Sequence, residues 1–322
     1  MGNVHSERIA ALRSVMSENG WDAVVITGSD PHSSEYQAPR WKQVEWLTGF
    51  TGEAGDVVVT MDHAGLWTDS RYFIQALTQL EGTGVELHKT RQPDTVRIPQ
   101  WLVGRAKTVA VDGLCQSVSG VQEIEECLGK GGLVVDVPDL LQDLWEGRPQ
   151  IPVTPVTTLD VEAFGGIPRI DKISWLRKWM LLKGYDKVLL SSLDEISWML
   201  NVRGSDIDYN PLVISYLLVS QDYVKWFVRG AEQAEDLDTL DSFDELKADD
   251  VEIYDYSQVL EALSECSGAE GGSVIFVDPS TLNHHVSAHL KSVFAEDCIR
   301  LADSFQTVAG DSADAANAQT RA

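Results

Sequence analysis

The 322-residue sequence predicts an α/β protein made of two tandem copies of one domain, each a mixed β-sheet flanked by helices. Three observations predict this class. Apolar residues at helical spacing are followed by short apolar strands, similar patterns recur later in the chain, and a proline-rich segment lies between them. With 43% hydrophobic residues, the chain is long enough for about two ordinary domains.

The first predicted element is a helix from Arg8, because its apolar residues recur every three or four positions: Ile9, Leu12, Val15 and Met16. Gly20 follows where a helix end favours a left-handed residue. The apolar run 23–26 then predicts a buried strand.

Parts of this segment recur 164 positions later: Leu176, Arg177, Met180, Gly184, Tyr185 and Asp186 stand where Leu12, Arg13, Met16, Gly20, Trp21 and Asp22 stood. Trp46-Leu47 is echoed by Trp198-Met199, VELH at Val85 by VEIY at Val251, and VAVDG at Val109 by IFVDP at Ile275. We therefore expect a nearly constant offset of 164–166 residues and a superposition of residues 8–140 on 171–303.

Prolines gather between the copies, at positions 149, 152, 155 and 168. We expect one domain over residues 1–145, an extended linker over 146–168 and a second domain over 169–303. The segment 304–322 is small and polar, and we expect a polar tail there.

The net charge is −25, from 50 acidic and 25 basic residues. This balance disfavours nucleic acid and anionic membrane surfaces as partners, because both require basic patches. No apolar run reaches the length of a membrane span. The four cysteines, at positions 115, 127, 266 and 298, lack metal-ligand spacing. We interpret them as reduced thiols of a cytoplasmic protein.

Several motifs suggest sites. Gly49, Gly52 and Gly55 precede a strand-like run, so we expect a tight turn between two strands rather than a phosphate loop. His32, Glu35, Asp62 and His63 offer no clear third metal ligand, and His284, His285 and His289 lack the glutamate of a zinc motif. The sequence therefore predicts no metal site.

Arg71 follows Asp69 in WTDSRYF. Its guanidinium fork suits a carboxylate or a peptide carbonyl, and an internal ion pair with Asp69 is an equally open interpretation. In a second polar segment we expect Asp194 to cap a helix beginning at Glu195, and Arg203 and Asp206 to hold the following loop.

The segments SDPHSSEYQAP, GFTGEAG and WTDSRYFIQA resemble the first domain of cytosolic Xaa-Pro aminopeptidases (aminopeptidase P), which are similar to creatinase and prolidase. LDEISWMLNVRGSDIDYNP resembles their second domain. The resemblance spans about residues 26–300. It implies two creatinase N-terminal-like domains, and in the longer family members a catalytic domain follows.

The resemblance implies a hydrolase, a metallopeptidase acting on peptides with proline second. Two metal ions, usually manganese, activate its water, and two Asp, one His and two Glu hold them. None of these ligands is placed in this sequence, so we expect the catalytic domain to lie outside the chain and the chain to hold no catalytic or metal residue. Arg71 matches the family's substrate-binding arginine. Cytoplasmic location and a possible homodimer of the full-length form are further expectations.

A stand-alone, non-catalytic peptide-binding or assembly module remains the alternative interpretation. In the enzyme interpretation, these domains contribute substrate access and binding rather than the metal site. A reading frame that continues into paired acidic residues and a histidine-rich motif favours the enzyme.

Overall fold

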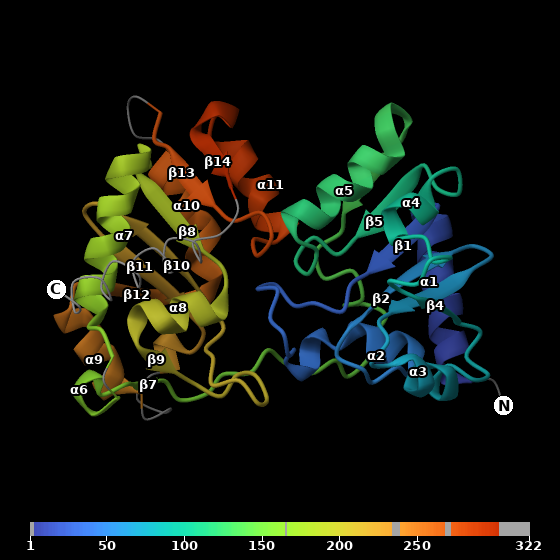
Figure 1. The fold of residues 1–322 in the computed structure, drawn as a ribbon, viewed down its shortest axis with the longest axis horizontal. Coiled ribbons are helices and arrows are strands. Elements are labelled where there is room, and N and C mark those ends of the chain that lie inside the picture. Colours follow the sequence, from blue (N-terminus) through green and yellow to red (C-terminus); the bar gives the residue numbers. More distant parts are fainter. Residues whose placement is uncertain (1–2, 165, 234–238, 268–271, 303–322) are drawn as a thin grey trace. The chain divides into compact units, whose positions relative to one another are not determined.

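The computed structural model describes residues 3–164, 166–233, 239–267 and 272–302 (Figure 1). The chain divides into two compact units. The first unit comprises residues 1–151 with 283–285, and the second comprises the remainder from Pro152. The predicted polar tail, 304–322, lies outside the described residues.

The first unit contains one six-stranded mixed sheet with helices before and after its strands. Its strands are β1 (Ala23–Ile26), β2 (Gly55–Thr60), β3 (Ala64–Thr68), β4 (Glu86–Lys89), β5 (Thr108–Val111) and β6 (Leu133–Asp136). Its helices are α1 (Val4–Asn19), α2 (Gln43–Thr48), α3 (Phe73–Gln79), α4 (Ile98–Leu102) and α5 (Val118–Leu128), with short 3₁₀ turns at Pro39–Trp41 and Gly129–Gly131.

The second unit repeats this arrangement. Its main strands are β8 (Lys187–Leu190), β10 (Ser215–Ser220), β11 (Val224–Val228), β12 (Val251–Asp255), β13 (Ile275–Val277) and β14 (Ile299–Leu301). Its helices are α7 (Arg169–Lys183), α8 (Leu193–Leu200), α9 (Leu240–Ala248), α10 (Val259–Ser267) and α11 (His284–Val293), with 3₁₀ turns at Ala231–Gln233, Tyr256–Gln258 and Glu296–Cys298.

The two sheets have the same strand order. The first runs β4-β3-β2-β1-β5-β6 and the second β12-β11-β10-β8-β13-β14. In both, the first strand pairs antiparallel with the next strand on one side and parallel with a later strand on the other. The prediction of two tandem mixed-sheet domains is confirmed.

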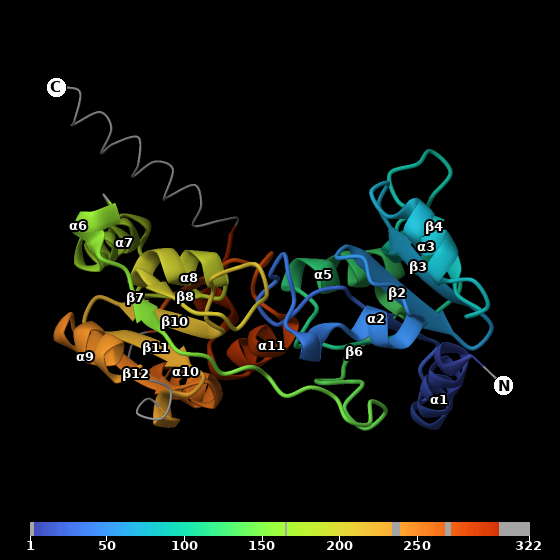
Figure 2. The ribbon, with the colours of Figure 1, turned by 90° about the horizontal axis from the view of Figure 1, so that it is seen from below.

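Alternate residues of the first sheet enter separate hydrophobic clusters, as expected for a sheet covered on both faces. Val24 and Ile26 pack with Leu12 and Met16 of α1. Ala23 and Val25 enter the other cluster, whose helical members come from α4 and α5. Helices therefore bury both faces of the sheet (Figure 2).

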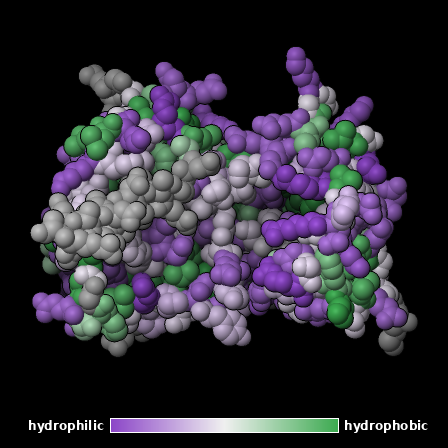
Figure 3. Space-filling model, viewed as in Figure 1, coloured by the Kyte–Doolittle hydropathy of each residue, from purple (hydrophilic) through white to green (hydrophobic). Residues whose placement is uncertain are grey.

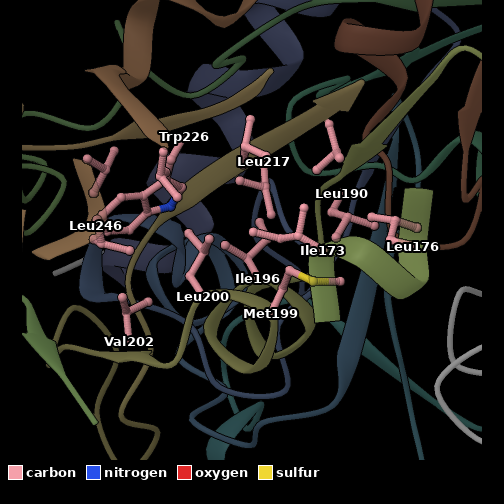
Figure 4. Packing of buried hydrophobic residues seen from close by; sticks show 14 of the residues in the cluster. Ile173, Leu176, Leu190, Ile196, Met199, Leu200, Val202, Leu217, Trp226 and Leu246 are labelled. Carbon is pink, nitrogen blue, oxygen red and sulfur yellow. The ribbon is translucent and has the colours of Figure 1, made fainter. Parts of the chain in front are cut away.

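One hydrophobic cluster of the second unit joins the sheet to α7, α8 and α9. Trp226 of β11 is fully buried within it and stands edge-on to Phe243 of α9, with ring centroids 5.9 Å apart. Figure 4 shows this packing around Leu217, Ile196 and Met199. Burial on this scale is the main favourable contribution to folding.

The first helix of each unit forms as its sequence predicts. In α1, Ile9, Leu12 and Met16 are buried, and Gly20 ends the helix with φ 70°. Asn3 caps the start by accepting a hydrogen bond from the His5 amide at 2.9 Å. Gly184 ends α7 in the same left-handed conformation, with φ 72°.

Two arginines at equivalent positions of the repeat make the same hydrogen bond in both units. Arg13 donates from Nε to the Thr60 carbonyl at 2.8 Å, and Arg177 donates to the Ser220 carbonyl at 2.8 Å. Thr60 and Ser220 are the last residues of equivalent strands, β2 and β10. The echoed arginines therefore bind the first helix to the sheet.

The echo of Trp46 by Trp198 is also structural. The Arg8 guanidinium lies 4.6 Å from the Trp46 ring, and the Lys172 ammonium lies 4.4 Å from the Trp198 ring. Each cation also donates to the carbonyl of its tryptophan.

The expectation of a constant offset is wrong for this pair of residues, because Trp46 and Trp198 are 152 residues apart. The reason is loop length. A long segment, 27–42, precedes α2, whereas only Ser191 and Ser192 precede α8, and the second unit places its long segment after α8.

The expected glycine turn between two strands is also wrong. Gly49 and Gly52 lie between helix α2 and strand β2, and Gly55 is the first residue of β2. Gly49 ends α2 with φ 80°, and its amide donates to the Glu45 carbonyl at 2.8 Å. The strand-like run after the first two glycines was identified correctly, and it forms β2.

The segment expected as a linker is not wholly extended. It contains β7 (Thr157–Thr158) and α6 (Val161–Phe164), and β7 pairs antiparallel with β9 (Val202–Arg203). Val156 is buried with the core of the second unit. The C-terminal part of this proline-rich segment therefore packs on the second unit.

Surface chemistry agrees with the composition. Hydrophilic side chains cover much of the face shown in Figure 3. All four cysteines are free. Within the described ranges, no helix combines the length and apolar character needed to cross a membrane.

Candidate functional site

Arg71 lies in the short connection between β3 and α3, where the sequence suggested a substrate contact. Asp69 folds this connection. Its Oδ1 accepts from the Arg71 amide and from Arg71 Nε, both at 3.0 Å, and its Oδ2 accepts from Arg71 Nη2 at 2.7 Å. The internal ion pair that the sequence left open is therefore present.

The pair is exposed on the arginine side. The Arg71 side chain is 66% exposed, whereas that of Asp69 is 21% exposed. The hydrogen bond from Arg71 lowers the pKa of Asp69, and the same pairing raises the pKa of Arg71. Among hydrogen bonds between described residues, none uses Arg71 Nη1. The Arg71 guanidinium is thus held in one orientation, and its Nη1 can donate to another acceptor.

The residue after the arginine anchors the connection. Tyr72 packs partly buried on the core and stands edge-on to the fully buried Phe50, with ring centroids 5.8 Å apart. Gly52 makes this packing possible, since a Cβ there would lie 2.2 Å from Phe50 and 2.8 Å from Tyr72. Arg71 therefore projects from a rigid backbone.

An apolar strip continues from this connection along α3. Ile74 is 84% exposed and Leu77 is 57% exposed. They lie three residues apart, on neighbouring positions of one helical face. A cationic fork beside exposed apolar side chains is an arrangement suited to contact with a peptide or another protein surface.

The segment 29–38 holds the other polar residues that the sequence suggested. Asp30 is buried, and its Oδ1 accepts from the His32 and Ser34 amides, both at 2.9 Å. His32 is buried too, whereas Glu35 is exposed. The charge of Glu35 contributes to the raised pKa of Arg71, so these two side chains face the same region.

The second unit's polar segment forms a hydrogen-bonded loop, as expected for Asp206. Its carboxylate is buried and accepts from Thr154 Oγ1 at 2.7 Å and from the Ile214 amide at 2.8 Å. Burial raises the pKa of Asp206. Arg203 donates to the Val202 carbonyl at 2.8 Å.

Asp194 does not cap a helix that begins at Glu195. Helix α8 begins at Leu193, and its N-cap residue is Ser192. Asp194 lies in the first turn, where its carboxylate accepts from the Ser192 hydroxyl. Its negative charge there complements the helix dipole.

The residues considered as metal ligands from sequence do not converge. Within the described part of the chain, one group brings together three donors of the required type: His63, Glu86 and His88, each with a ligand atom within 4.8 Å of the others. His63 was considered from sequence, but Glu86 and His88 were missed. The sequence pattern that could have identified Glu86 and His88 is VELH, because alternate residues of a strand lie on one face.

Two sequence models of the family described as creatinase/prolidase N-terminal domain match this chain. One matches residues 8–144 and the other residues 147–306. Together they span both units.

Named relatives are Xaa-Pro aminopeptidases. Aminopeptidase P2 of Arabidopsis thaliana is 31% identical over 315 residues, which is 95% of this chain and 42% of the relative. An Xaa-Pro aminopeptidase of Caenorhabditis elegans is 34% identical over 286 residues, covering 86% of this chain and 45% of the relative. The chain thus spans less than half of these relatives.

Among solved structures, X-prolyl aminopeptidase from Caenorhabditis elegans, described as a cytosolic enzyme with a di-nuclear active site, superposes with a TM-score of 0.84 at 30% identity. The superposition covers 94% of this chain and 50% of that protein. The strand order of the two sheets, the two sequence models and the superposition all indicate two related domains of one family. The chain belongs to the creatinase/prolidase N-terminal domain family and carries two of its domains in tandem.

Proposed function

We propose that this chain is the N-terminal, non-catalytic portion of a metal-dependent Xaa-Pro aminopeptidase, which removes the N-terminal residue from peptides with proline second. The observation that carries the proposal is the similarity of both units, over 94% of the chain, to an X-prolyl aminopeptidase. In this proposal residues 1–145 and 169–303 are the two accessory domains.

The role of these domains is substrate access and binding. Arg71 carries it, because Asp69 orients the guanidinium while most of the side chain stays exposed. A fork held on a rigid connection can bind a peptide carbonyl or carboxylate with little loss of side-chain entropy. The exposed Ile74 and Leu77 supply adjacent apolar surface.

The metal chemistry belongs to a catalytic domain in the longer protein. There, two manganese ions would activate the water that attacks the peptide bond. Cytoplasmic location and a homodimer of the longer protein are parts of the same proposal. The net charge of −25 supports a partner other than nucleic acid or an anionic membrane.

The test is a pair of peptides that differ at the second residue. The longer protein is assayed with Mn²⁺ on a peptide with proline second and on the matched peptide with alanine second. We expect release of the first residue from the proline peptide and at least about tenfold slower release from the alanine peptide. Equal rates on both peptides, or no release from either, would contradict the proposal.

A further inference from the structure

His63, Glu86 and His88 meet at one edge of the first unit's sheet. Glu86 and His88 are alternate residues of β4 and therefore share a face. His63 comes from the turn between β2 and β3, where the Thr60 amide donates to its carbonyl at 2.8 Å and closes the hairpin. Three donor side chains thus converge from two rigid elements.

The donor spacing fits one metal ion. Nε2 of His63 lies 3.2 Å from Nε2 of His88. Two nitrogens at about 2.0–2.1 Å from a tetrahedral zinc ion lie about 3.3–3.4 Å apart. Glu86 Oε2 lies 3.8 Å from Nδ1 of His63, the other nitrogen of that ring. Because the Glu86 side chain is 68% exposed, its carboxylate can rotate toward the two Nε2 atoms without disturbing the core.

Both imidazoles are held in place by aromatic neighbours. The His88 ring stacks on Trp67 with centroids 3.9 Å apart and an angle of 3°, and Trp67 Nε1 donates to the Val96 carbonyl at 2.9 Å. The His63 ring lies 4.9 Å from the Trp101 ring. Fixed ligand orientation is what a metal site requires of its supporting residues.

Gly65 makes the room for the two rings. A Cβ at this position would lie 2.7 Å from His63 Nε2 and 2.8 Å from His88 Nε2. Gly65 is paired with Glu86 across β3 and β4, so it lies at the centre of the three donors. The absence of a side chain there keeps the space between them open.

The second unit shows what occupies the same place in the other copy. There, Lys225 stands at the position of Gly65, since it pairs with Glu252 as Gly65 pairs with Glu86. The Lys225 ammonium lies 5.1 Å from the Tyr223 ring and 5.3 Å from the Tyr254 ring. The second copy thus supplies its own cation between two aromatic rings.

The correspondence extends to each ligand. Tyr223 closes its hairpin as His63 does, because the Ser220 amide donates to its carbonyl at 3.0 Å. Tyr254 stacks on Phe227, with ring centroids 5.6 Å apart, as His88 stacks on Trp67. The first unit therefore has imidazoles where the second has phenols, and no side chain where the second has an ammonium group.

The surroundings leave a position for a further ligand. A surface pocket of about 360 Å³ includes the three donors together with Thr60, Asp62 and Arg105. Arg105 is engaged elsewhere, since its guanidinium lies 4.7 Å from the Trp101 ring and donates to the Trp101 carbonyl at 2.8 Å. Water can enter this pocket as a fourth ligand.

From this geometry we propose that His63, Glu86 and His88 bind one Zn²⁺ ion, in the place that the Lys225 ammonium occupies in the second unit. Two imidazoles and one carboxylate form a donor set used by zinc. Imidazole nitrogen also favours Zn²⁺ over Mn²⁺.

The test is Zn²⁺ binding by the 322-residue chain, freed of metal by a chelator and titrated against a chromophoric zinc indicator. We expect one equivalent to bind, and Co²⁺ at the same site to give visible absorption of a tetrahedral complex. Loss of an outer-shell partner alone weakens metal binding about 10–100-fold. We therefore expect Glu86→Gln and His63→Gln each to weaken Zn²⁺ binding at least about 100-fold.

The matched control is Glu252→Gln, which changes the equivalent carboxylate in the second unit and should leave Zn²⁺ affinity unchanged. Circular dichroism and thermal melting in EDTA establish that each variant is folded. Absence of stoichiometric binding by the unaltered chain would overturn the proposal, as would equal affinity of the Glu86→Gln and Glu252→Gln variants. The readout is metal binding, so its outcome does not depend on the proposed peptidase function.

Discussion

The Arg71 side chain is held in one orientation by Asp69 and is also exposed. At the scale of single residues, its contribution to substrate binding can therefore be measured apart from its contribution to folding. An exposed ion pair such as Asp69–Arg71 contributes about 0–1 kcal/mol to folding. A charged hydrogen bond to a bound substrate contributes about 1.5–3 kcal/mol. Substitution of Arg71 is therefore expected to affect substrate binding more than folding.

In the longer protein, we expect Arg71→Ala to lower kcat/KM about 10–100-fold on a peptide with proline second, with a nearly unchanged melting temperature. Arg71→Lys keeps the charge and loses the fork, so we expect it to recover only part of the activity. The measurements are steady-state kinetics and thermal melting of the same preparations.

Arg97→Ala is the matched control for Arg71. The Arg97 side chain is also 66% exposed and also pairs with one carboxylate, that of Glu123. It should leave kcat/KM unchanged. Normal kinetics in Arg71→Ala would contradict the substrate-binding role, and a large fall in its melting temperature would assign Arg71 a structural role instead.

Glu195 provides a second prediction for a single residue. Burial, with the neighbouring charges of Asp194 and Asp278, raises its pKa to about 7. Because the folded pKa lies above the ordinary value, the folded state loses stability as pH rises from about 4.5 to 7, and the penalty is complete above that range.

We expect Glu195→Gln to remove this penalty. A pKa raised from 4.5 to about 7 corresponds to about 3 kcal/mol, so the variant should be more stable than the parent chain by up to about 3 kcal/mol at pH 8 and equally stable at pH 4. Thermal melting at the two pH values provides the measurement. A variant that is less stable at pH 8 would show that the Glu195 carboxylate is favourably placed instead.

At the scale of elements, the first helix of each unit is fastened to the sheet by one arginine. Arg13 and Arg177 were predictable as equivalent residues, because the helix, its glycine end and the following strand are continuous in sequence. Helical periodicity and glycine conformation are local effects, so sequence reports them directly.

Other features depend on loop length and pairing, which local patterns do not report. The spacing of Trp46 and Trp198 changed because each unit places its long segment on a different side of the equivalent helix. Glu86 and His88 approach His63 only through the pairing of β3 with β4. Such contacts follow from the order of strands in the sheet, so a short sequence motif does not predict them.

We expect Arg13→Ala to increase amide hydrogen exchange in β2 and leave β10 unchanged, and Arg177→Ala to do the reverse. Each substitution removes a charged donor from a strand-end carbonyl, at a cost of about 1.5–3 kcal/mol. Hydrogen exchange with mass spectrometry resolves the two strands.

Arg105→Ala is the control for this pair, because Arg105 lies in the turn after α4 and donates to a carbonyl of that neighbouring helix, that of Trp101. It should change exchange in neither β2 nor β10. If Arg13→Ala and Arg177→Ala each change both strands equally, the two units do not open independently.

At the scale of the whole molecule, two units of one family carry different chemistry on the same scaffold. The first presents an exposed fork at Arg71 and a histidine pair beside Gly65, whereas the second presents a lysine between two tyrosines. The agreement in strand order between the two sheets was predictable from the recurring patterns, whereas the order itself was not. The differences between the side chains at equivalent positions were not predicted, because they depend on which residues the strand pairing brings together.

We expect the 322-residue chain alone to release no amino acid from a peptide with proline second, with either Mn²⁺ or Zn²⁺ present. The proposed roles of its residues are binding roles, and the proposed function assigns the activation of water to a catalytic domain of the longer protein. The assay measures release against a control with metal and no protein. Turnover above that control would assign catalysis to this chain.

Because the two sheets share one strand order, a strand of one unit can pair with the wrong sheet while the chain folds. Strand β4 could add to β11 instead of β3, because both offer the same parallel register in the first stages of assembly. Tandem copies of one fold are prone to such misassembly. The exchanged pairing would place His88 instead of Tyr254 beside Lys225 and Tyr223, and the converse exchange would place Tyr254 instead of His88 beside Gly65 and His63. Either exchange would mix the two sets of side chains, so neither sheet edge would regain the ring pair that it has in the native pairing.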